Sequence, residues 1–206
     1  MRVAVVVAGG FSERFGSADK AVAPIGDTAM IGVVLDRLEE AVDHIVINVR
    51  HSQRQAIEAV IEDVTVPVSF AIDPAPDRGP TYGLYIALGQ LPPSTESIFA
   101  VGVDMPWLDP AVVSHLFTRL ESTDVDAVVP RRPDGSLEVL HGTYRPAPLR
   151  AACKHVLGEE YTGLLHTLKR LTVTYVEDEE LEDIGQLRTF EDVNTREEYE
   201  RLLREG

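Results

Sequence analysis

The chain has 206 residues, 44% of them hydrophobic, which suits one well-buried α/β domain over residues 1–206. A formal net charge of -15 opposes binding to nucleic acid or to anionic membranes. No apolar run reaches the roughly 20 residues of a membrane span, and residues 3–8 lack the basic leader of a signal peptide. The single cysteine, Cys153, excludes an intrachain disulfide and favours a reducing, cytoplasmic location. Composition leaves open whether the chain is a monomer or a weak homo-oligomer.

The basic residues are chosen unevenly. Only Lys20, Lys154 and Lys169 are lysines, so 16 of the 19 basic residues are arginines. Many carboxylates with few lysines are typical of a protein kept soluble in concentrated salt, where screening removes the self-repulsion. We hypothesise a halophilic source; the alternative is an ordinary acidic cytosolic protein. Unfolding measured against KCl concentration tests the hypothesis, and full stability at low salt contradicts it.

Short runs rich in β-branched residues alternate with longer segments of helical period. This alternation predicts an α/β fold, a Rossmann-like three-layer sandwich whose mostly parallel sheet is covered by helices on both faces. The expected strands cover residues 3–8, 44–49, 68–72, 98–103, 127–130 and 172–176. The expected helices cover residues 29–41, 53–61, 82–91, 111–120 and 147–156.

Local signals add detail to the second half of the chain. Asp109 followed by proline is an N-cap signature and begins the helix over residues 111–120. The tight-turn residues 133–135 precede an apolar stretch at 137–144, which predicts a hairpin and hence at least one antiparallel strand.

The C-terminal region shows two further signals. Thr195 and Glu198 form a capping box, so the last helix begins at Thr195. The acidic residues 177–183 are interpreted as a solvated loop.

The strongest functional signal follows the first strand, at residues 8–20 (Ala-Gly-Gly-Phe-Ser-Glu-Arg-Phe-Gly-Ser-Ala-Asp-Lys). Gly9 and Gly10 allow the backbone to approach a ligand and to turn its N–H groups toward phosphate. Arg14 and Lys20 add cations suited to a triphosphate. The spacing matches neither a P-loop nor the dinucleotide-binding fingerprint.

Other polar residues also follow expected strands, where ligands bind in open sheets of this kind. Asn48 ends the second strand, Asp73 follows the third, and Asp104 follows the fourth. Mg²⁺ prefers oxygen ligands and is typically held by one or two carboxylates plus substrate phosphates. Asp104 is therefore the favoured metal ligand, with a turn or capping role as the alternative.

These motifs resemble the molybdenum cofactor guanylyltransferases, a MobA-like branch of the GT-A type nucleotidyltransferases. The likeness runs along the whole chain, through residues 8–20, 78–84, 104–106, 140–144 and 192–195. The family usually has Leu where Val7 stands, commonly Met where Phe15 stands, and Gly-Pro-Leu-Ala-Gly where residues 79–83 read Gly-Pro-Thr-Tyr-Gly. The last departure lies near the expected ligand cleft.

The resemblance implies a fold, a reaction and a set of site residues. The fold is that of the nucleotide-diphospho-sugar transferases, and the reaction is transfer of GMP from GTP to molybdopterin with Mg²⁺ as cofactor. Catalysis would fall to Arg14, Lys20 and Asp104, and the metal ligands would be Asp104 and Asn194, with Asp192 less securely indicated. The nucleotide would contact Val7, Ala8, Gly9, Gly10, Lys20, Asn48, Asp73 and Asp104.

Several of these roles have plainer alternatives. Asp73 and Asn194 are also ordinary turn-forming residues, and Arg78 is either a phosphate contact or a solvated side chain. His141 is more often a hydrogen-bonded structural histidine than a catalyst. At the level of function, the acceptor could be cobinamide phosphate, the donor could be CTP, or the chain could be a non-catalytic nucleotide sensor or an interaction protein.

Overall fold

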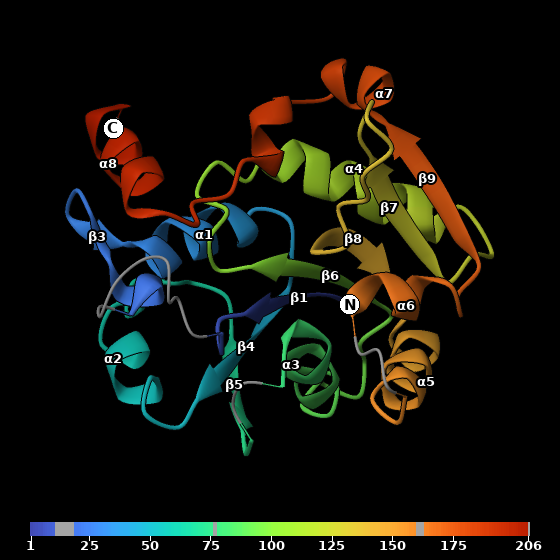
Figure 1. Ribbon diagram of the computed structural model, residues 1–206, viewed down its shortest axis with the longest axis horizontal. Helices are drawn as coiled ribbons and strands as arrows, with labels where there is room; N and C mark the ends of the chain where they lie inside the picture. The colour runs from blue at the N-terminus through green and yellow to red at the C-terminus, as the bar shows by residue number, and fades with distance from the viewer. Residues whose placement is uncertain (11–18, 76–77, 160–162, 206) are drawn as a thin grey trace.

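The computed structural model describes residues 1–10, 19–75, 78–159 and 163–205 (Figure 1). The strands are β1 (Arg2–Val7), β2 (Pro24–Ile25), β3 (Thr28–Ala29), β4 (His44–Arg50), β5 (Val68–Asp73), β6 (Ser97–Gly102), β7 (Ala127–Arg131), β8 (His141–Tyr144) and β9 (Val173–Glu177). The α-helices are α1 (Met30–Leu38), α2 (Arg54–Glu58), α3 (Pro80–Ala87), α4 (Pro110–Glu121), α5 (Pro146–Val156), α6 (Leu164–Leu168), α7 (Asp178–Glu182) and α8 (Arg196–Glu205). The 3₁₀ helices are η2 (Lys20–Val22) and η3 (Leu187–Phe190).

A seven-stranded sheet forms the centre of the molecule, in the order β5-β4-β1-β6-β8-β7-β9. The pairs β1–β4, β1–β6, β4–β5 and β7–β9 are parallel, whereas β8 is antiparallel to both of its neighbours. After β1 the chain builds outward through β4 and β5, and then returns to place β6 on the other side of β1. This reversal of strand order beside β1 is the position at which open α/β sheets bind ligands.

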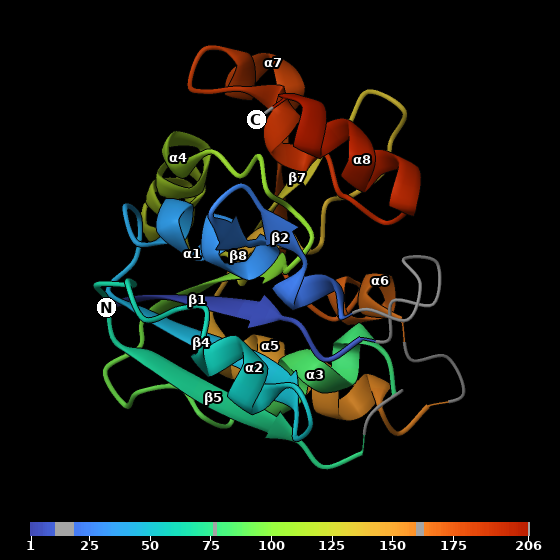
Figure 2. The same cartoon turned by 90° about the vertical axis from the view of Figure 1, so that its left-hand side faces the viewer.

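Helices cover both faces of the sheet, as the apolar strand runs predict. Alternate residues of a strand point to opposite faces, and in β1 Ala4 and Val6 join one core cluster while Val3 and Val5 join the other. Helices α1 and α4 lie on the first face, and α3 and α5 lie on the second (Figures 1 and 2). The three-layer α/β prediction is therefore confirmed.

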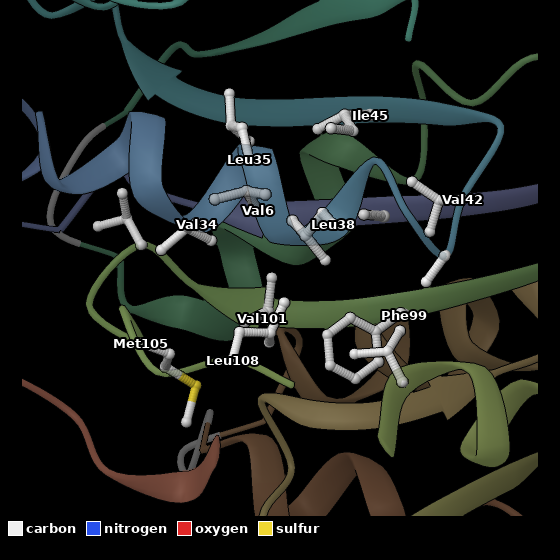
Figure 3. Close-up of a cluster of buried hydrophobic side chains, with 14 of the residues drawn as sticks. Val6, Val34, Leu35, Leu38, Val42, Ile45, Phe99, Val101, Met105 and Leu108 are labelled. Atoms are coloured by element: carbon white, nitrogen blue, oxygen red, sulfur yellow. The ribbon is translucent and has the colours of Figure 1, made fainter. Parts of the chain in front are cut away.

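The larger core cluster lies between the sheet and the α1–α4 layer. Figure 3 shows Leu35 and Leu38 of α1 beside Val6, with Phe99 and Val101 of β6 below them. All five side chains are fully buried. The same cluster includes Met105 and Leu108, so the segment after β6 is anchored in the core on both sides of Trp107.

The capping signals are confirmed in detail. The Asp109 Oδ1 accepts from the Ala111 N at 2.9 Å at the start of α4. At α8, the Glu198 N donates to the Thr195 Oγ1 at 3.2 Å and the Thr195 N donates to the Glu198 Oε2 at 2.8 Å. These caps fix where α4 and α8 begin, shortly after the chain segments that contain Asp104 and Asn194.

Helix α3 begins two residues earlier than the sequence predicts. Its N-cap, Gly79, has a φ of 78°, in the left-handed region that favours glycine, and Pro80 then takes the first helical position. The start of α3 is thereby directed at the carboxyl end of the sheet.

The acidic segment 177–183 was expected to be a solvated loop, and this prediction is wrong. The segment forms α7, in which Leu181 is fully buried and Asp178 is 6% exposed. Asp178 forms an ion pair with Arg132 at 3.2 Å, which compensates for the burial of its carboxylate. The expected strand over residues 137–144 is also shorter than predicted, since β8 covers only its last four residues.

The C-terminal helix α8 packs against residues from the N-terminal part of the chain. Tyr199 and Leu202 of α8 form a small core with Ala23 and Met30, on the layer that holds the β2–β3 hairpin and α1. This packing brings residues 192–194 to the carboxyl end of the sheet. Within the described ranges, no helix is both long and apolar enough to cross a membrane.

Candidate functional site

A pocket of about 530 Å³ opens at the carboxyl ends of β1, β4, β5 and β6. The sequence-predicted residues that line it are Val7, Ala8, Gly9, Gly10, Lys20, Asn48, Asp73, Asp104 and Asn194. Its remaining walls are formed by Asp19, Ala21, Gly79, Pro80, Gly83, Gly102, Val103 and Leu140. Arg14 lies outside the described residues. The other residues predicted to bind the nucleotide or the metal line this one pocket, except Asp192, whose side chain pairs with Asn194 beside it.

Asn48 lies at the floor of the pocket and dictates where glycine is needed. Its Nδ2 donates to the Ala71 carbonyl at 3.2 Å, and its buried Oδ1 has no hydrogen-bond partner in the described part of the chain. A β-carbon added at Gly9 would lie 2.9 Å from that oxygen, and one added at Gly83 would lie 2.4 Å from it. A side chain at either position would force the Asn48 Oδ1 to move, and among the described residues the pocket floor carries an acceptor without a hydrogen-bond donor that a ligand can supply.

Asp73 forms a local turn and also lines the pocket. It ends β5, and its Oδ1 accepts from the Ala75 N at 2.9 Å in a local turn. The side chain also lines the pocket while the residue is only 8% exposed.

Three residues from distant parts of the chain meet in one ionic cluster. The Lys20 Nζ donates to the Asp104 Oδ2 at 2.9 Å and to the Asn194 Oδ1 at 3.0 Å. The Lys20 side chain is 6% exposed and the Asp104 side chain 27%, so the pair lies at the boundary between core and pocket. Two oxygens that converge on one ammonium group can equally converge on a metal cation.

Gly102 shapes this cluster from below. A β-carbon at Gly102 would lie 2.3 Å from the Asp104 Oδ1, a distance that no real side chain tolerates. The Asp104 carboxylate therefore folds back over the end of β6. The Asp104 carbonyl accepts from the Val193 N at 2.9 Å, which ties the C-terminal segment to this strand end.

Asp192 adds a second carboxylate beside the cluster. The Asn194 Nδ2 donates to the Asp192 Oδ2 at 2.6 Å, which orients the Asn194 oxygen toward Lys20. Burial, and after it the neighbouring charge of Asp104, raises the pKa of the Asp192 carboxyl. The two carboxylates and the amide oxygen form a hard oxygen-donor set. The described residues contain no group of three or more His, Cys, Asp or Glu side chains placed for a metal.

Similarity to known proteins identifies the family of this chain. A family model described as "MobA-like NTP transferase domain" matches residues 4–180. The chain belongs to the MobA-like NTP transferase family. The matched range contains the glycine loop, Lys20 and Asp104, whereas Asn194 lies beyond its end.

Curated MobA-like relatives cover nearly the whole chain. A protein from Natronomonas pharaonis named "Probable molybdenum cofactor guanylyltransferase" is 38% identical over 97% of this chain and 96% of its own length. A protein of the same name from Haloferax mediterranei is 33% identical over 94% of this chain and 89% of its own length.

Solved structures share the fold. Molybdopterin-guanine dinucleotide biosynthesis protein A from Archaeoglobus fulgidus superposes with a TM-score of 0.80 at 23% identity, covering 99% of this chain and 97% of that one. The 4-diphosphocytidyl-2C-methyl-D-erythritol synthase of Anaerococcus prevotii superposes with a TM-score of 0.75 at 12% identity, over 99% and 97% of the two chains. The nucleotidyltransferase fold is thereby confirmed.

Two residues that the sequence did not indicate, Arg50 and Gln53, hold the carbonyl groups of the glycine turn that follows β1. Arg50 ends β4, and its guanidinium donates to the Gly10 carbonyl at 2.9 Å and to the Asp19 Oδ2 at 3.0 Å. The Gln53 Nε2 donates to the Ala8 carbonyl at 3.2 Å. The available signal was a cation and an amide directly after a predicted strand, at the same sheet edge as Asn48.

Arg78 and His141 take positions away from the ionic cluster. The Arg78 guanidinium stacks on the Tyr82 ring at 4.3 Å in an exposed position. His141 is fully buried, and its Nε2 pairs with the Thr189 Oγ1 at 3.0 Å. Burial, and second the charge of Arg132, lowers the pKa of His141 to about 3. A neutral, sealed imidazole fits the structural role rather than catalysis.

Proposed function

We propose that this chain transfers GMP from GTP to the terminal phosphate of molybdopterin, releasing pyrophosphate. The observation that carries the proposal is the convergence of Lys20, Asp104 and Asn194 on one point of the pocket that Gly9 also lines. Two relatives that align along almost the full chain bear the name molybdenum cofactor guanylyltransferase, which supports the same donor and acceptor.

The transfer is a displacement at phosphorus. An oxygen of the acceptor phosphate forms a bond to the α-phosphorus of GTP, and the bond from that phosphorus to the bridging oxygen of the β-phosphate breaks. The electron pair leaves with pyrophosphate. The attacking phosphate oxygen is already anionic near neutral pH, so the reaction requires no general base. This agrees with a pocket whose polar groups are cations, amides and carboxylates.

The chain's own residues position the triphosphate and neutralise its charge. The Lys20 ammonium supplies a fixed positive charge at the phosphates. The backbone at Gly9 and Gly10 approaches the phosphates closely because neither residue has a side chain. Asn48 and Asp73, deeper in the pocket, offer acceptors to the nucleoside. Arg14 is proposed as a second phosphate cation on the basis of its position in the loop sequence.

The donor set fits a divalent cation such as Mg²⁺. Asp104 and Asn194 would hold it, with Asp192 beside them, because hard cations take carboxylate and amide oxygens. A bound Mg²⁺ supplies charge neutralisation on the phosphate oxygens and a template for their geometry. Gly102 has no side chain, which leaves room for the Asp104 carboxylate to point toward that position.

Pyrophosphate release tests the proposal and its alternatives. We expect release with GTP and molybdopterin in the presence of Mg²⁺, and background release when either is omitted. Preference for CTP, or turnover with cobinamide phosphate in place of molybdopterin, would move the assignment to a related transferase. Binding of GTP without any release would indicate a nucleotide sensor.

A thermal-shift panel with GTP, CTP, ATP and UTP gives an independent measure of donor choice. The nucleotide that binds the folded chain raises its Tm by mass action. We expect the largest shift with GTP and Mg²⁺, and no shift with any nucleotide would contradict the enzyme assignment.

A further inference from the structure

Arg50 bridges the backbone at Gly9 and Gly10 and the side chain of Asp19, three residues that line the pocket. Its Nη1 donates to the Gly10 carbonyl at 2.9 Å and lies 3.5 Å from the Gly9 carbonyl. Its Nη2 donates to the Asp19 Oδ2 at 3.0 Å. The Arg50 side chain is 12% exposed; its bond to the Gly10 carbonyl lies at an exposed position, and its bonds to the Gly9 carbonyl and to Asp19 are partly buried. One guanidinium thus ties together the two ends that flank residues 11–18.

The first consequence concerns the direction of the glycine amides. In a trans peptide the N–H points opposite to the C=O of the same unit. Gln53 holds the Ala8 carbonyl and Arg50 holds the Gly9 and Gly10 carbonyls, all from the β4 side. The Gly9 N–H shares its peptide unit with the Ala8 carbonyl and therefore points away from Gln53. The Gly10 N–H shares its unit with the Gly9 carbonyl and points away from Arg50. Both glycines line the pocket on which these amides can act.

The second consequence concerns the cation that reaches the ionic cluster. The Asp19 Oδ1 accepts from the Ala21 N at 3.1 Å and thereby caps η2, while its Oδ2 accepts from Arg50. Lys20 is the first residue of η2, directly after the capped position. The place from which Lys20 extends to Asp104 is thus set by a carboxylate that Arg50 holds.

We propose that Arg50 is a positioning residue for the triphosphate: through the Gly9 carbonyl it orients the Gly10 amide, and through Asp19 it fixes the origin of Lys20, without contacting the nucleotide itself. The inference rests on the proposed function, since it assigns Arg50 to the same nucleotide site. The planar guanidinium is suited to this role because its several N–H donors reach two acceptors at a fixed separation. A lysine at this position carries the same charge but lacks the fixed fork.

The experiment measures GTP binding to the full chain by calorimetry with Mg²⁺, for the wild type, Arg50→Met and Arg50→Lys. We expect Arg50→Met to raise the Kd about tenfold and Arg50→Lys to raise it about threefold, the range found for coupled polar networks. In turnover, Arg50→Met should raise KM for GTP and lower kcat, and should leave KM for the acceptor unchanged. A general loss of stability would not raise the KM for GTP while leaving the KM for the acceptor unchanged.

Arg54→Met is the matched control for charge. Arg54 lies four residues further along, pairs with Glu58 at 2.8 Å on the helix surface and stands outside the pocket lining. Its removal changes the net charge by the same amount, so GTP affinity equal to that of the wild type is expected. An equal loss in both variants would mean that long-range charge, and not the bridge, is responsible, and would overturn the inference.

A double-mutant cycle with Asp19→Asn separates bridging from direct contact. If Arg50 acts through Asp19, the double variant should bind GTP about as weakly as Arg50→Met alone, because coupled residues are not additive. Multiplied losses would overturn the inference. Should Arg50→Met fail to fold, Arg50→Lys and Asp19→Asn carry the test, and wild-type affinity in both would overturn it.

The proposed function can fail separately. Wild-type chain that binds GTP without releasing pyrophosphate would refute the transferase, whereas the Kd series would still decide the role of Arg50. Unchanged GTP affinity in Arg50→Met would overturn the inference and leave the transferase standing. Absence of any nucleotide binding by the wild type would overturn both.

Discussion

Two polar clusters lie at the same end of the central sheet, and they behave in opposite ways. Lys20, Asp104 and Asn194 form an ionic cluster that faces the pocket. His141 pairs across the sheet with Val101, one residue before Gly102, yet its side chain is fully buried against Phe99 and Phe190. One cluster is charged and open, and the other is neutral and sealed.

Access to the pocket accounts for the difference. A buried charge is tolerated only when it is paired, and Lys20 is paired by two oxygens at the pocket wall. His141 has only the Thr189 hydroxyl as a partner in the described part of the chain, and burial keeps its imidazole neutral. A polar residue in a functional motif is therefore assigned to chemistry by what it faces, and not by the motif alone.

The largest effect expected is from Asp104→Asn, which removes the negative charge of the open cluster, leaves the Lys20 charge in place and keeps the shape of the side chain. We expect kcat to fall on the order of 10²–10³-fold, the loss typical of one preorganised electrostatic contact. Pyrophosphate release measures the loss, and circular dichroism checks that the fold is retained. Turnover near the wild-type rate would remove Asp104 from the proposed site.

Asp109→Ala is the matched control for Asp104. Asp109 also follows β6, but its carboxylate caps α4 and accepts from the Gln186 N at 2.9 Å. Loss of an N-cap costs about 1 kcal/mol of unfolding free energy, so this variant should be less stable and should turn over normally.

Gly102→Ala tests the geometry of the open cluster without changing any charge. The new methyl group would lie 2.3 Å from the Asp104 Oδ1, so the carboxylate must turn away from its present position. A displacement of this kind is expected to lower kcat on the order of 10¹–10²-fold. Gly163→Ala is the control, since its β-carbon would meet its nearest atom, the His166 Nδ1, at 3.6 Å. Equal activity in the two variants would show that the Asp104 orientation does not matter.

The sequence predicts the residues that face the pocket better than the contacts that position them. Asp104 and Asn48 follow long, buried, β-branched runs, so their place at the sheet edge can be derived from strand alternation and topology. The position of Asn194 depends on α8 packing against Met30 and Ala23, a contact between distant segments that no local pattern reveals.

The elements that the sequence missed are short or tertiary in origin. The β2–β3 hairpin has two residues in each strand and α7 has five, too few to establish a period. The acidic composition of α7 suggested a solvated loop because the partner of Asp178, Arg132, is distant in sequence. Arg50 was missed for the same reason, because its acceptors become neighbours only when β4 pairs with β1.

Thr189→Val sharpens the comparison from the sealed side. The Thr189 Oγ1 accepts from the Asp109 N at 2.9 Å and pairs with the His141 Nε2 at 3.0 Å, so an isosteric valine leaves both groups unpaired. We expect the free energy of unfolding to fall by about 2 kcal/mol, with kcat within about twofold of the wild type because neither Thr189 nor His141 lines the pocket. Urea unfolding and pyrophosphate release measure the two quantities.

Thr118→Val is the control for the loss of a hydroxyl. The Thr118 Oγ1 donates to the Ser114 carbonyl of its own helix at 2.9 Å, in an exposed position where water can replace it. A similar loss of stability in both threonine variants would mean that the sealed cluster contributes nothing particular.

The smallest effect expected is a pH dependence of stability that arises from His141. The pKa of His141 is about 3 in the folded chain against the ordinary 6.5 of a histidine, chiefly because of burial. Between these values the unfolded chain binds a proton that the folded chain does not, so stability is present above pH 6.5 and is lost as the pH falls below it. From pH 7 to pH 5.5 the share of His141 is about 1 kcal/mol.

Urea unfolding at these two pH values, in the wild type and in His141→Gln, isolates that share. The variant should be less stable at neutral pH and should lose less stability on acidification, because glutamine does not titrate. His51→Gln, at an exposed position, should keep the wild-type dependence. Equal pH dependence in the wild type and His141→Gln would mean that the folded chain protonates His141 readily. The His141 cluster would then not be the neutral, sealed counterpart of the charged, open cluster.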